Sequence, residues 1–176
     1  MENITLRVAG IMDNCITNGQ GIRKVIFLQG CNHKCPGCFN QHTWDMNGGV
    51  EYNIDQLYDM IMEDKHAIDG VTFSGGDPFE QSRNLSKLLR KLKQQQINIW
   101  CYTGYDINFI MEAIYLKRHD KLLWDELMNN IDYLVEGPFI QELADPKLLY
   151  RGSSNQNIID VQELIKSGKI KIFEES

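Results

Sequence analysis

The sequence alternates short apolar runs, each closely followed by glycine, with segments that repeat apolar residues at helical spacing. The apolar runs are residues 24–29 (KVIFLQ), 70–74 (GVTFS), 97–102 (INIWCY) and 131–135 (IDYLV). Near-continuous apolar runs of this length are typical of strands buried on both faces of a parallel sheet. The sequence therefore predicts four buried strands.

Amphipathic helices are expected between these strands. The first should begin at Asn53, an N-cap residue that Gln56 can complete as a capping box, and the third at Asp106. The apolar stripes of the three helices are Ile54, Leu57, Tyr58, Ile61 and Met62; Leu85, Leu88, Leu89 and Leu92; and Ile107, Ile110, Ala113 and Ile114. Residues 150–173 predict a polar turn, a short strand, a helix ending near Gly168 and a last strand.

This alternation predicts an α/β fold, with a parallel sheet covered by helices. A closed barrel of eight such units takes about 250 residues, whereas this chain has 176. An incomplete TIM-type β/α barrel or an open sheet remains, formed by a single domain over residues 1–176. In both architectures function gathers beyond the carboxyl ends of the strands.

Composition excludes several functional classes. Hydrophobic residues make up 43% and charged residues 24% of the chain, as in ordinary soluble domains. The formal net charge is −6, without a basic run interleaved with aromatics, so no nucleic acid partner is expected. The N-terminus MENITLRVAG lacks a signal-peptide pattern, and no stretch reaches the ~20 apolar residues of a membrane span. A cytoplasmic protein without membrane partners is expected.

Three cysteines are concentrated in one short segment. Cys31, Cys35 and Cys38 form a CxxxCxxC pattern directly after the first predicted strand. Three thiolates on a tight loop suit an iron–sulfur cluster or zinc. Cubane clusters normally take four cysteines, but only Cys15 and Cys101 remain, each isolated in the sequence. A three-cysteine cluster with one open iron is therefore one interpretation, and the two isolated cysteines are expected to be ordinary thiols.

Structural zinc is the alternative. A site of three cysteines and one histidine could recruit His33, inside the loop, or His42, just after it. His33 lies between ligating cysteines on a short loop, where its ring is poorly placed to reach the same ion. It is therefore expected to be a solvated loop residue.

The segment CNHKCPGCFNQHTW resembles the radical S-adenosylmethionine superfamily, whose motif is CxxxCxxC. An aromatic residue usually precedes the third cysteine there, whereas this chain has Gly37 in that place and Phe39 after the cysteine. That shift is similar to one branch, the anaerobic ribonucleoside-triphosphate reductase-activating proteins. Further segments resemble this branch: NGQGIR at 18–23, FNQHTW at 39–44, SGGDP at 74–78, YTGY at 102–105, VEGPF at 135–139 and YRGSSNQ at 150–156.

The resemblance implies a [4Fe-4S] cluster held by Cys31, Cys35 and Cys38, whose fourth iron is chelated by the amino and carboxylate groups of S-adenosylmethionine. SGGDP matches the superfamily's GGE-type segment, with Asp77 in place of the commoner Glu. Glycines there allow close approach to the cofactor because they lack a side chain. The residues expected to bind cofactor are Gly37, Cys38, Phe39, Gly75, Gly76 and Asp77.

The implied activity is that of an oxidoreductase without a catalytic acid or base beyond the cluster. Reductive cleavage of S-adenosylmethionine would give methionine and a 5′-deoxyadenosyl radical, which takes a glycine hydrogen from anaerobic ribonucleoside-triphosphate reductase and leaves a glycyl radical. The implied partners are that reductase and a low-potential electron donor such as reduced flavodoxin. Two alternatives stay open, an activase of another glycyl-radical enzyme and a non-catalytic zinc-binding module.

Overall fold

The structure, a computed structural model, describes residues 3–118, 121 and 123–174. Its strands are β1 (Thr5–Cys15), β2 (Arg23–Leu28), β3 (Val50–Asn53), β4 (Gly70–Gly75), β5 (Ile99–Tyr102), β6 (Tyr133–Glu136) and β7 (Asn157–Asp160). Its α-helices are α1 (Ile54–Glu63), α2 (Ser82–Gln94), α3 (Ile107–Tyr115), α4 (Trp124–Asn129) and α5 (Val161–Ser167). Short 3-10 turns are η1 (Gln41–Thr43), η2 (Pro78–Gln81) and η4 (Gln141–Leu143).

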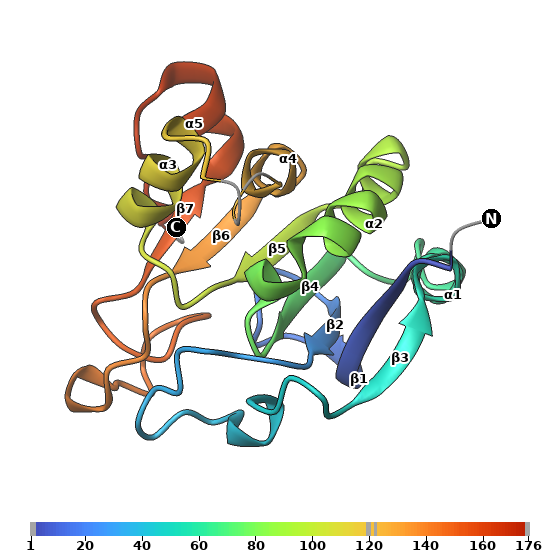
Figure 1. Cartoon of the computed structure of the whole chain (residues 1–176), viewed down its shortest axis with the longest axis horizontal. Coiled ribbons are helices and arrows are strands. Elements are labelled where there is room, and N and C mark those ends of the chain that lie inside the picture. Colours follow the sequence, from blue (N-terminus) through green and yellow to red (C-terminus); the bar gives the residue numbers. More distant parts are fainter. Residues whose placement is uncertain (1–2, 119–120, 122, 175–176) are drawn as a thin grey trace.

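The strands form one seven-stranded sheet in the order β3-β1-β2-β4-β5-β6-β7 (Figure 1). The four predicted strands, β2, β4, β5 and β6, are its parallel centre, as expected. The sheet is not wholly parallel, because β1, β3 and β7 pair antiparallel at its two sides. Within the described residues the end strands β3 and β7 do not pair with each other, so the sheet stays unclosed and the fold is the predicted α/β incomplete barrel.

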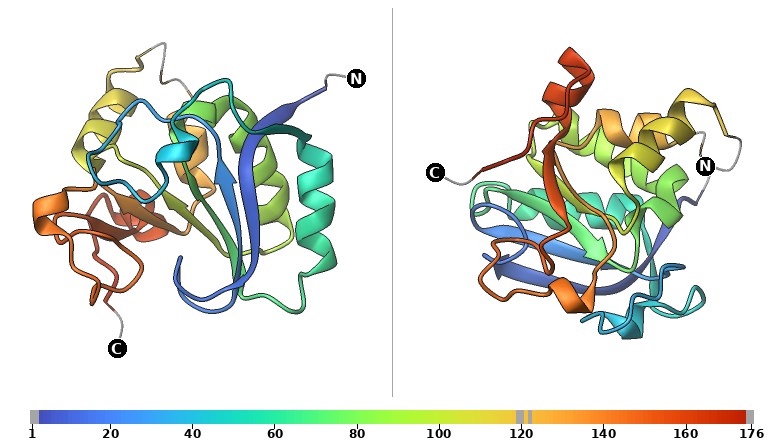
Figure 2. Two further views of the ribbon diagram at one scale, coloured as in Figure 1. Left: turned by 90° about the horizontal axis from the view of Figure 1, so that it is seen from below. Right: turned by 90° about the vertical axis from the view of Figure 1, so that its left-hand side faces the viewer.

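The two faces of the sheet bury different side chains. Ile99 and Cys101 of β5 face the main core, which the α-helices cover, whereas Trp100 belongs to a smaller cluster on the opposite face. Figure 2 shows the helices gathered on one side of the sheet and long loops on the other. Alternate residues of β5 therefore pack against the helices on one face of the sheet and against the loops on the other face.

The helix boundaries follow the predicted caps. The Asn53 side chain accepts a hydrogen bond from the Asp55 N–H, and the Gln56 side chain accepts one from the Asn53 N–H, which is the predicted capping box. Asp106 caps α3 in the same manner. Gly168 ends α5 with a positive φ of 72°, a conformation that glycine adopts without strain.

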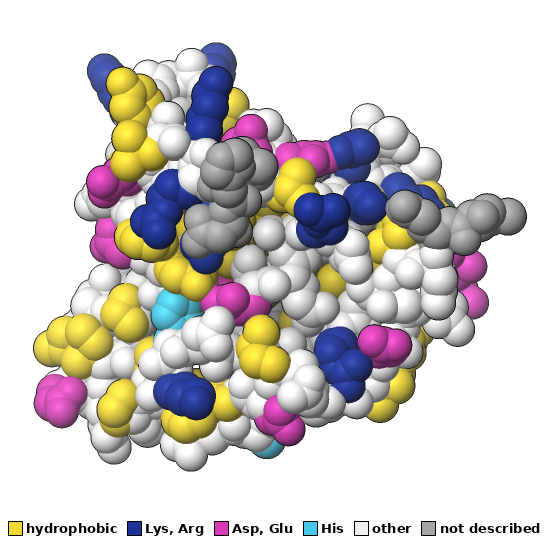
Figure 3. Space-filling model, in the orientation of Figure 1, with side chains coloured by type: hydrophobic (Ala, Val, Ile, Leu, Met, Phe, Trp, Pro, Cys, Tyr) yellow, Lys and Arg dark blue, Asp and Glu magenta, His cyan; other side chains and the backbone are white. Residues whose placement is uncertain are grey.

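The predicted last strand is shortened to a single bridge between Ile159 and Ile172. No helix among the described residues is long and apolar enough to cross a membrane. On the face seen in Figure 3, acidic and basic side chains are interspersed, and hydrophobic side chains gather along the lower, loop-built edge.

Candidate metal centre

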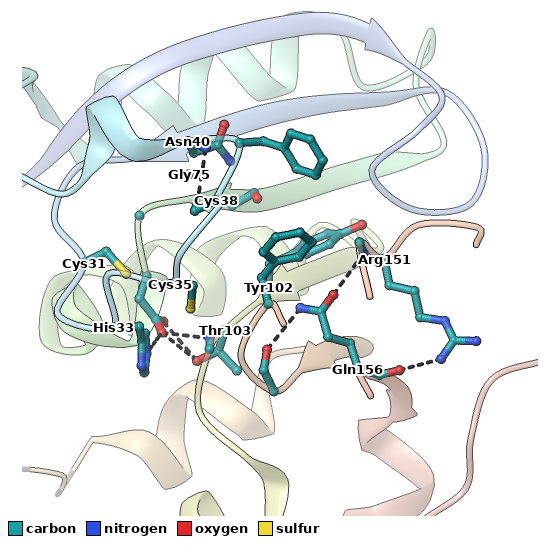
Figure 4. Close-up of a pocket in the computed structure, with 18 of the residues that line it drawn as sticks. Cys31, His33, Cys35, Cys38, Asn40, Gly75, Tyr102, Thr103, Arg151 and Gln156 are labelled. Atoms are coloured by element: carbon teal, nitrogen blue, oxygen red, sulfur yellow. Dashed lines mark hydrogen bonds and ion pairs between the residues drawn. The ribbon is translucent and has the colours of Figure 1, made fainter. Parts of the chain in front are cut away.

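A cavity of about 440 Å³ opens where β2, β4, β5 and β6 end (Figure 4). Its walls are the loops that follow these four strands. Its volume lies in the range of small-molecule sites, about 300 to 1,000 Å³. Predicted site residues that line it are Cys31, Cys35, Cys38, Phe39, Gly75, Gly76 and Asp77. Gly37 is not among the lining residues, and a Cβ there would meet the Gln141 side chain at 2.9 Å.

The cysteine loop is held in place by backbone hydrogen bonds. Gly30 N–H donates to the Thr43 carbonyl at 2.6 Å, and Cys31 N–H donates to the Trp44 carbonyl at 3.3 Å. Cys38 N–H donates to the Cys35 carbonyl at 3.1 Å and closes a tight turn between these two cysteines. The loop therefore reaches the cavity with a fixed backbone.

Backbone groups lie close to each of the three thiols. Those of His33 and Lys34 act on Cys31, and that of Phe139 acts on Cys35, in the direction that lowers the pKa of these two thiols. Asn40 N–H donates to Cys38 Sγ, with a donor–acceptor distance of 3.4 Å. Such amides favour a thiolate and are among the contacts that tune iron–sulfur clusters.

Burial acts on these thiols in the opposite direction. It raises the pKa of Cys31 to about 11 and also raises the pKa of Cys35, and the backbone hydrogen bonds offset this only in part. Without metal these two side chains are therefore neutral thiols at pH 7 and weak nucleophiles. Metal ligation, in which the ion displaces the proton, is the chemistry that suits them.

Neither histidine supports a zinc site. His33 is not the solvated residue that the sequence predicted, because its side chain is only 18% exposed and its Nε2 lies 2.6 Å from Asp77 Oδ2. Its ring packs edge-on against Tyr105, with centroids 4.4 Å apart. His42 is exposed on η1. Within the described part of the chain, no three His, Cys, Asp or Glu side chains are grouped to hold a single ion.

The Asp77 carboxylate lies beneath the cavity and is 1% exposed. It accepts hydrogen bonds from the backbone N–H groups of Phe79 and Gly104, both at 3.0 Å. The Thr103 hydroxyl donates to it at 2.9 Å, and His33 lies on its other side. The contact to His33 raises the pKa of that imidazole, because a hydrogen bond to the carboxylate favours the cation more than burial disfavours it.

Gly75 and Gly76 are required by close backbone packing. A Cβ at Gly76 would lie 2.3 Å from the Gly30 carbonyl oxygen, and one at Gly75 would lie 2.5 Å from backbone atoms of Leu28. Gly75 also has a φ of +97°. The sequence predicted these glycines for approach to a cofactor, and the structure adds an approach to the protein's own backbone.

The far wall of the cavity comes from residues 137–156, which the sequence singled out only through the resemblance. Gln156 organises this segment, since its Oε1 accepts from the Gly152 and Ser153 N–H groups and its Nε2 donates to the Gly137 carbonyl. The Arg151 guanidinium donates to the Gln156 carbonyl, and the Tyr102 hydroxyl donates to the Tyr150 carbonyl. The contacts of Gln156 with Gly137 and of Tyr102 with Tyr150 join segments 19 and 48 positions apart, so no local pattern could reveal these two.

Comparisons with known proteins agree with this geometry. A family model described as a 4Fe-4S single cluster domain matches residues 17–159. The chain is 34% identical over 148 residues to the anaerobic ribonucleoside-triphosphate reductase-activating protein of Escherichia coli K12, covering 80% of this chain and 90% of that protein. The proteins of the same name from Vibrio cholerae and phage T4 are 36% and 32% identical, over 81% and 80% of this chain and 90% and 85% of theirs.

Among solved structures, QueE from Escherichia coli aligns with a TM-score of 0.48 and 18% identity, over 57% of this chain and 52% of that one.

Proposed function

Because the chain belongs to the family of anaerobic ribonucleoside-triphosphate reductase-activating proteins and contains its iron–sulfur domain, we propose that it generates a glycyl radical on that reductase. The observation that carries this proposal is the cavity, in which three cysteine thiols on one loop lie beside a glycine-lined strand end. This donor set fits an iron–sulfur cluster with three protein ligands.

In this proposal Cys31, Cys35 and Cys38 hold three irons of a [4Fe-4S] cluster, and the fourth iron is open to S-adenosylmethionine. Held by these residues, the cluster would supply the single electron for reductive cleavage of S-adenosylmethionine, and with it the means to remove the glycine α-hydrogen. The protein must bind, orient and shield these groups.

The remaining predicted site residues would serve the cofactor mainly through their backbone. The Asp77 carboxylate is occupied by protein donors, so segment 75–77 would offer its peptide groups rather than this side chain. Phe39 and Phe139 lie at the mouth of the cavity with ring centroids 5.5 Å apart. Apolar side chains at this position would limit the access of water to a reactive radical.

Substitution of each cysteine tests the ligand assignment. Alanine at position 31, 35 or 38 should abolish both the iron–sulfur absorbance and the production of 5′-deoxyadenosine by reconstituted, dithionite-reduced protein, since each removes one of three ligands. Cys15→Ala is the matched control, because Cys15 is buried outside the cavity lining and should leave both signals intact. Persistent 5′-deoxyadenosine production by any of the three variants would refute the assignment.

The partner is tested by electron paramagnetic resonance. Mixing the reduced protein with S-adenosylmethionine and anaerobic ribonucleoside-triphosphate reductase should produce a glycyl radical signal, with reduced flavodoxin able to replace dithionite. Cofactor cleavage without a signal on an authentic reductase would favour another glycyl-radical enzyme as substrate. Recovery of zinc without iron or acid-labile sulfide would instead favour a non-catalytic module.

A further inference from the structure

We propose that Asp77 is a positioning residue which, together with Glu80, clamps the loop between Cys31 and Cys35 in the shape that retains the cluster. The inference rests on the proposed function in one respect, that these cysteines are cluster ligands. It goes further because it gives the Asp77 side chain, in the SGGDP segment, the role of holding the loop between Cys31 and Cys35, which is called the metal loop below.

The first half of the clamp joins Asp77 to His33. The carboxylate oxygens of Asp77 receive hydrogen bonds from Thr103 and from the backbone N–H groups of Phe79 and Gly104, which fix it to the ends of β4 and β5. The side of the carboxylate facing the metal loop contacts His33 Nε2 at 2.6 Å. Figure 4 shows His33 and Thr103 beside the cysteine loop, with dashed lines from each to the carboxylate that lies between them. Asp77 therefore connects the loop to two central strands.

The second half joins Glu80 to Asn32, the loop residue that precedes His33. Glu80 Oε2 accepts from the Asn32 side chain at 3.2 Å, and Glu80 Oε1 accepts from the Tyr105 hydroxyl at 2.6 Å. The ring of Tyr105 in turn packs against His33. Both residues held by the clamp thus lie between two of the three cysteines.

The two acids are carried by one rigid turn. Asp77 caps η2, and the Glu80 N–H donates to the Asp77 carbonyl at 2.9 Å. The turn is also tied to the loop through its backbone, since Asp77 N–H donates to the Gly30 carbonyl at 2.8 Å. The loop is therefore anchored by peptide groups before Cys31 and by side chains after it.

Such anchoring affects a metal site in a specific way. A ligand loop that is already ordered loses less conformational entropy when it binds, and loss of an outer-shell partner typically costs 10- to 100-fold in metal affinity or activity. Asp77→Asn replaces one acceptor oxygen with an amide group at nearly constant volume. We expect this variant to lose its cluster to an iron chelator at least about 10-fold faster than the wild type.

Asp132→Asn is the matched control. Asp132 also pairs with a basic side chain and accepts a backbone N–H, but it serves Lys93 and the Ile99 N–H at the opposite end of β5. This control should lower the thermal midpoint while leaving the rate of cluster loss unchanged. An Asp77→Asn variant that keeps the wild-type rate would overturn the proposal without affecting the proposed function.

A double-mutant cycle with His33→Ala separates the clamp from general destabilisation. Because Asp77 is argued to act through His33, the combined variant should lose its cluster more slowly than the product of the two single effects predicts. Independent effects that multiply would contradict the assignment. Should Asp77→Asn not fold, His33→Ala keeps the strand-side bonds of Asp77 and must by itself accelerate cluster loss.

A measurement on the metal-free protein distinguishes failure of the clamp from failure of the proposed function. Hydrogen exchange of the amides at residues 31–35 should accelerate in Asp77→Asn and His33→Ala but not in Asp132→Asn. Unchanged exchange would overturn the clamp, even if the wild-type protein bound no cluster at all. Faster exchange in these two variants, together with a wild-type protein that takes up only zinc, would instead keep the clamp and refute the proposed function.

Discussion

Gly76 and Gly30 meet where the metal loop crosses the end of β4, and neither tolerates added bulk. Gly76 N–H donates to the carbonyl of Leu28, the last residue of β2, at 2.7 Å. The backbone after β4 and the backbone at the end of β2 are therefore already in hydrogen-bonding contact. On the other side of Gly30, an added Cβ would meet the Met46 sulfur at 2.7 Å. The position of the cysteines relative to β4 therefore depends on the absence of side chains at this crossing.

Gly76→Ala should destabilise the apoprotein by about 1 to 3 kcal/mol, because its methyl group would overlap the Gly30 carbonyl oxygen. Urea unfolding provides the measurement. Gly10→Ala is the control, since a Cβ there meets nothing within 4 Å, and it should be neutral or slightly stabilising. Equal stability of the two variants would show that the crossing can relax.

Helices and central strands were predictable from the sequence because each is marked by local chemistry. The capping box at Asn53 and the αL glycine at 168 set boundaries that depend only on neighbouring residues. The antiparallel strands β1 and β3 were missed for a physical reason, whereas β7 is the short strand predicted after residue 150. Strand β1 contains exposed residues and register irregularities, and β3 is four residues long with a largely exposed surface. The start of β1 alternates buried Leu6 and Val8 with polar residues, and β3 is short, so neither shows the near-continuous apolar run of the central strands.

The candidate site likewise has features that the sequence predicted and features that it did not. That the three cysteines and the glycines of SGGDP would lie at one end of the sheet was predictable, because each segment adjoins the end of a buried strand. The contact between His33 and Asp77 was not, because 44 residues separate the two partners in the sequence. The pairing of β2 with β4 brings them together, and no property of either local segment encodes it.

Asn53→Ala should cost about 1 kcal/mol of folding free energy, since the first turn of α1 loses the acceptor for the Asp55 N–H. Chemical denaturation of the apoprotein measures the change. Asp59→Ala, at an exposed position within the same helix, should stay within about 0.5 kcal/mol of the wild type. A neutral Asn53→Ala variant would mean that packing alone fixes the start of the helix.

The molecule as a whole is a sheet with helices on one side and a second, smaller core on the other. The Arg23 side chain packs against one side of this second core. Its guanidinium is buried and donates to the Thr72 hydroxyl and to the carbonyls of Gln20, Val71 and Asn98. Burial lowers its pKa to about 10. Above it Tyr102 forms part of the cavity wall, and burial raises the pKa of its phenol well above the usual value.

Tyr102 makes folding stability sensitive to alkaline pH. The Tyr102 phenol holds its proton more tightly in the folded state than in the unfolded state. Its contribution to the free energy of unfolding is therefore complete below about pH 10 and declines as the pH rises toward the pKa of the folded state. The decline approaches about 1.4 kcal/mol per pH unit for one group. Tyr102→Phe should be less stable than the wild type by about 1 kcal/mol at pH 8, where it lacks the hydrogen bond to Tyr150, yet lose stability less steeply above pH 10.

Urea unfolding of the reduced apoprotein between pH 8 and 11 measures both effects. Tyr115→Phe, at a tyrosine that is 84% exposed, is the control and should follow the wild-type curve. Parallel alkaline slopes for wild type and Tyr102→Phe would contradict the predicted role of this phenol.

The clamp on the metal loop also bears on when the site forms during biosynthesis. A ribosome releases the cysteines well before the residues that anchor them, because Asp77 follows His33 by 44 positions and Thr103 follows Asp77 by another 26. Until β5 has joined the sheet, Asp77 lacks the hydrogen bonds from Thr103 and Gly104 that fix its carboxylate. The proposed clamp is therefore complete only in the finished fold and not in the nascent chain.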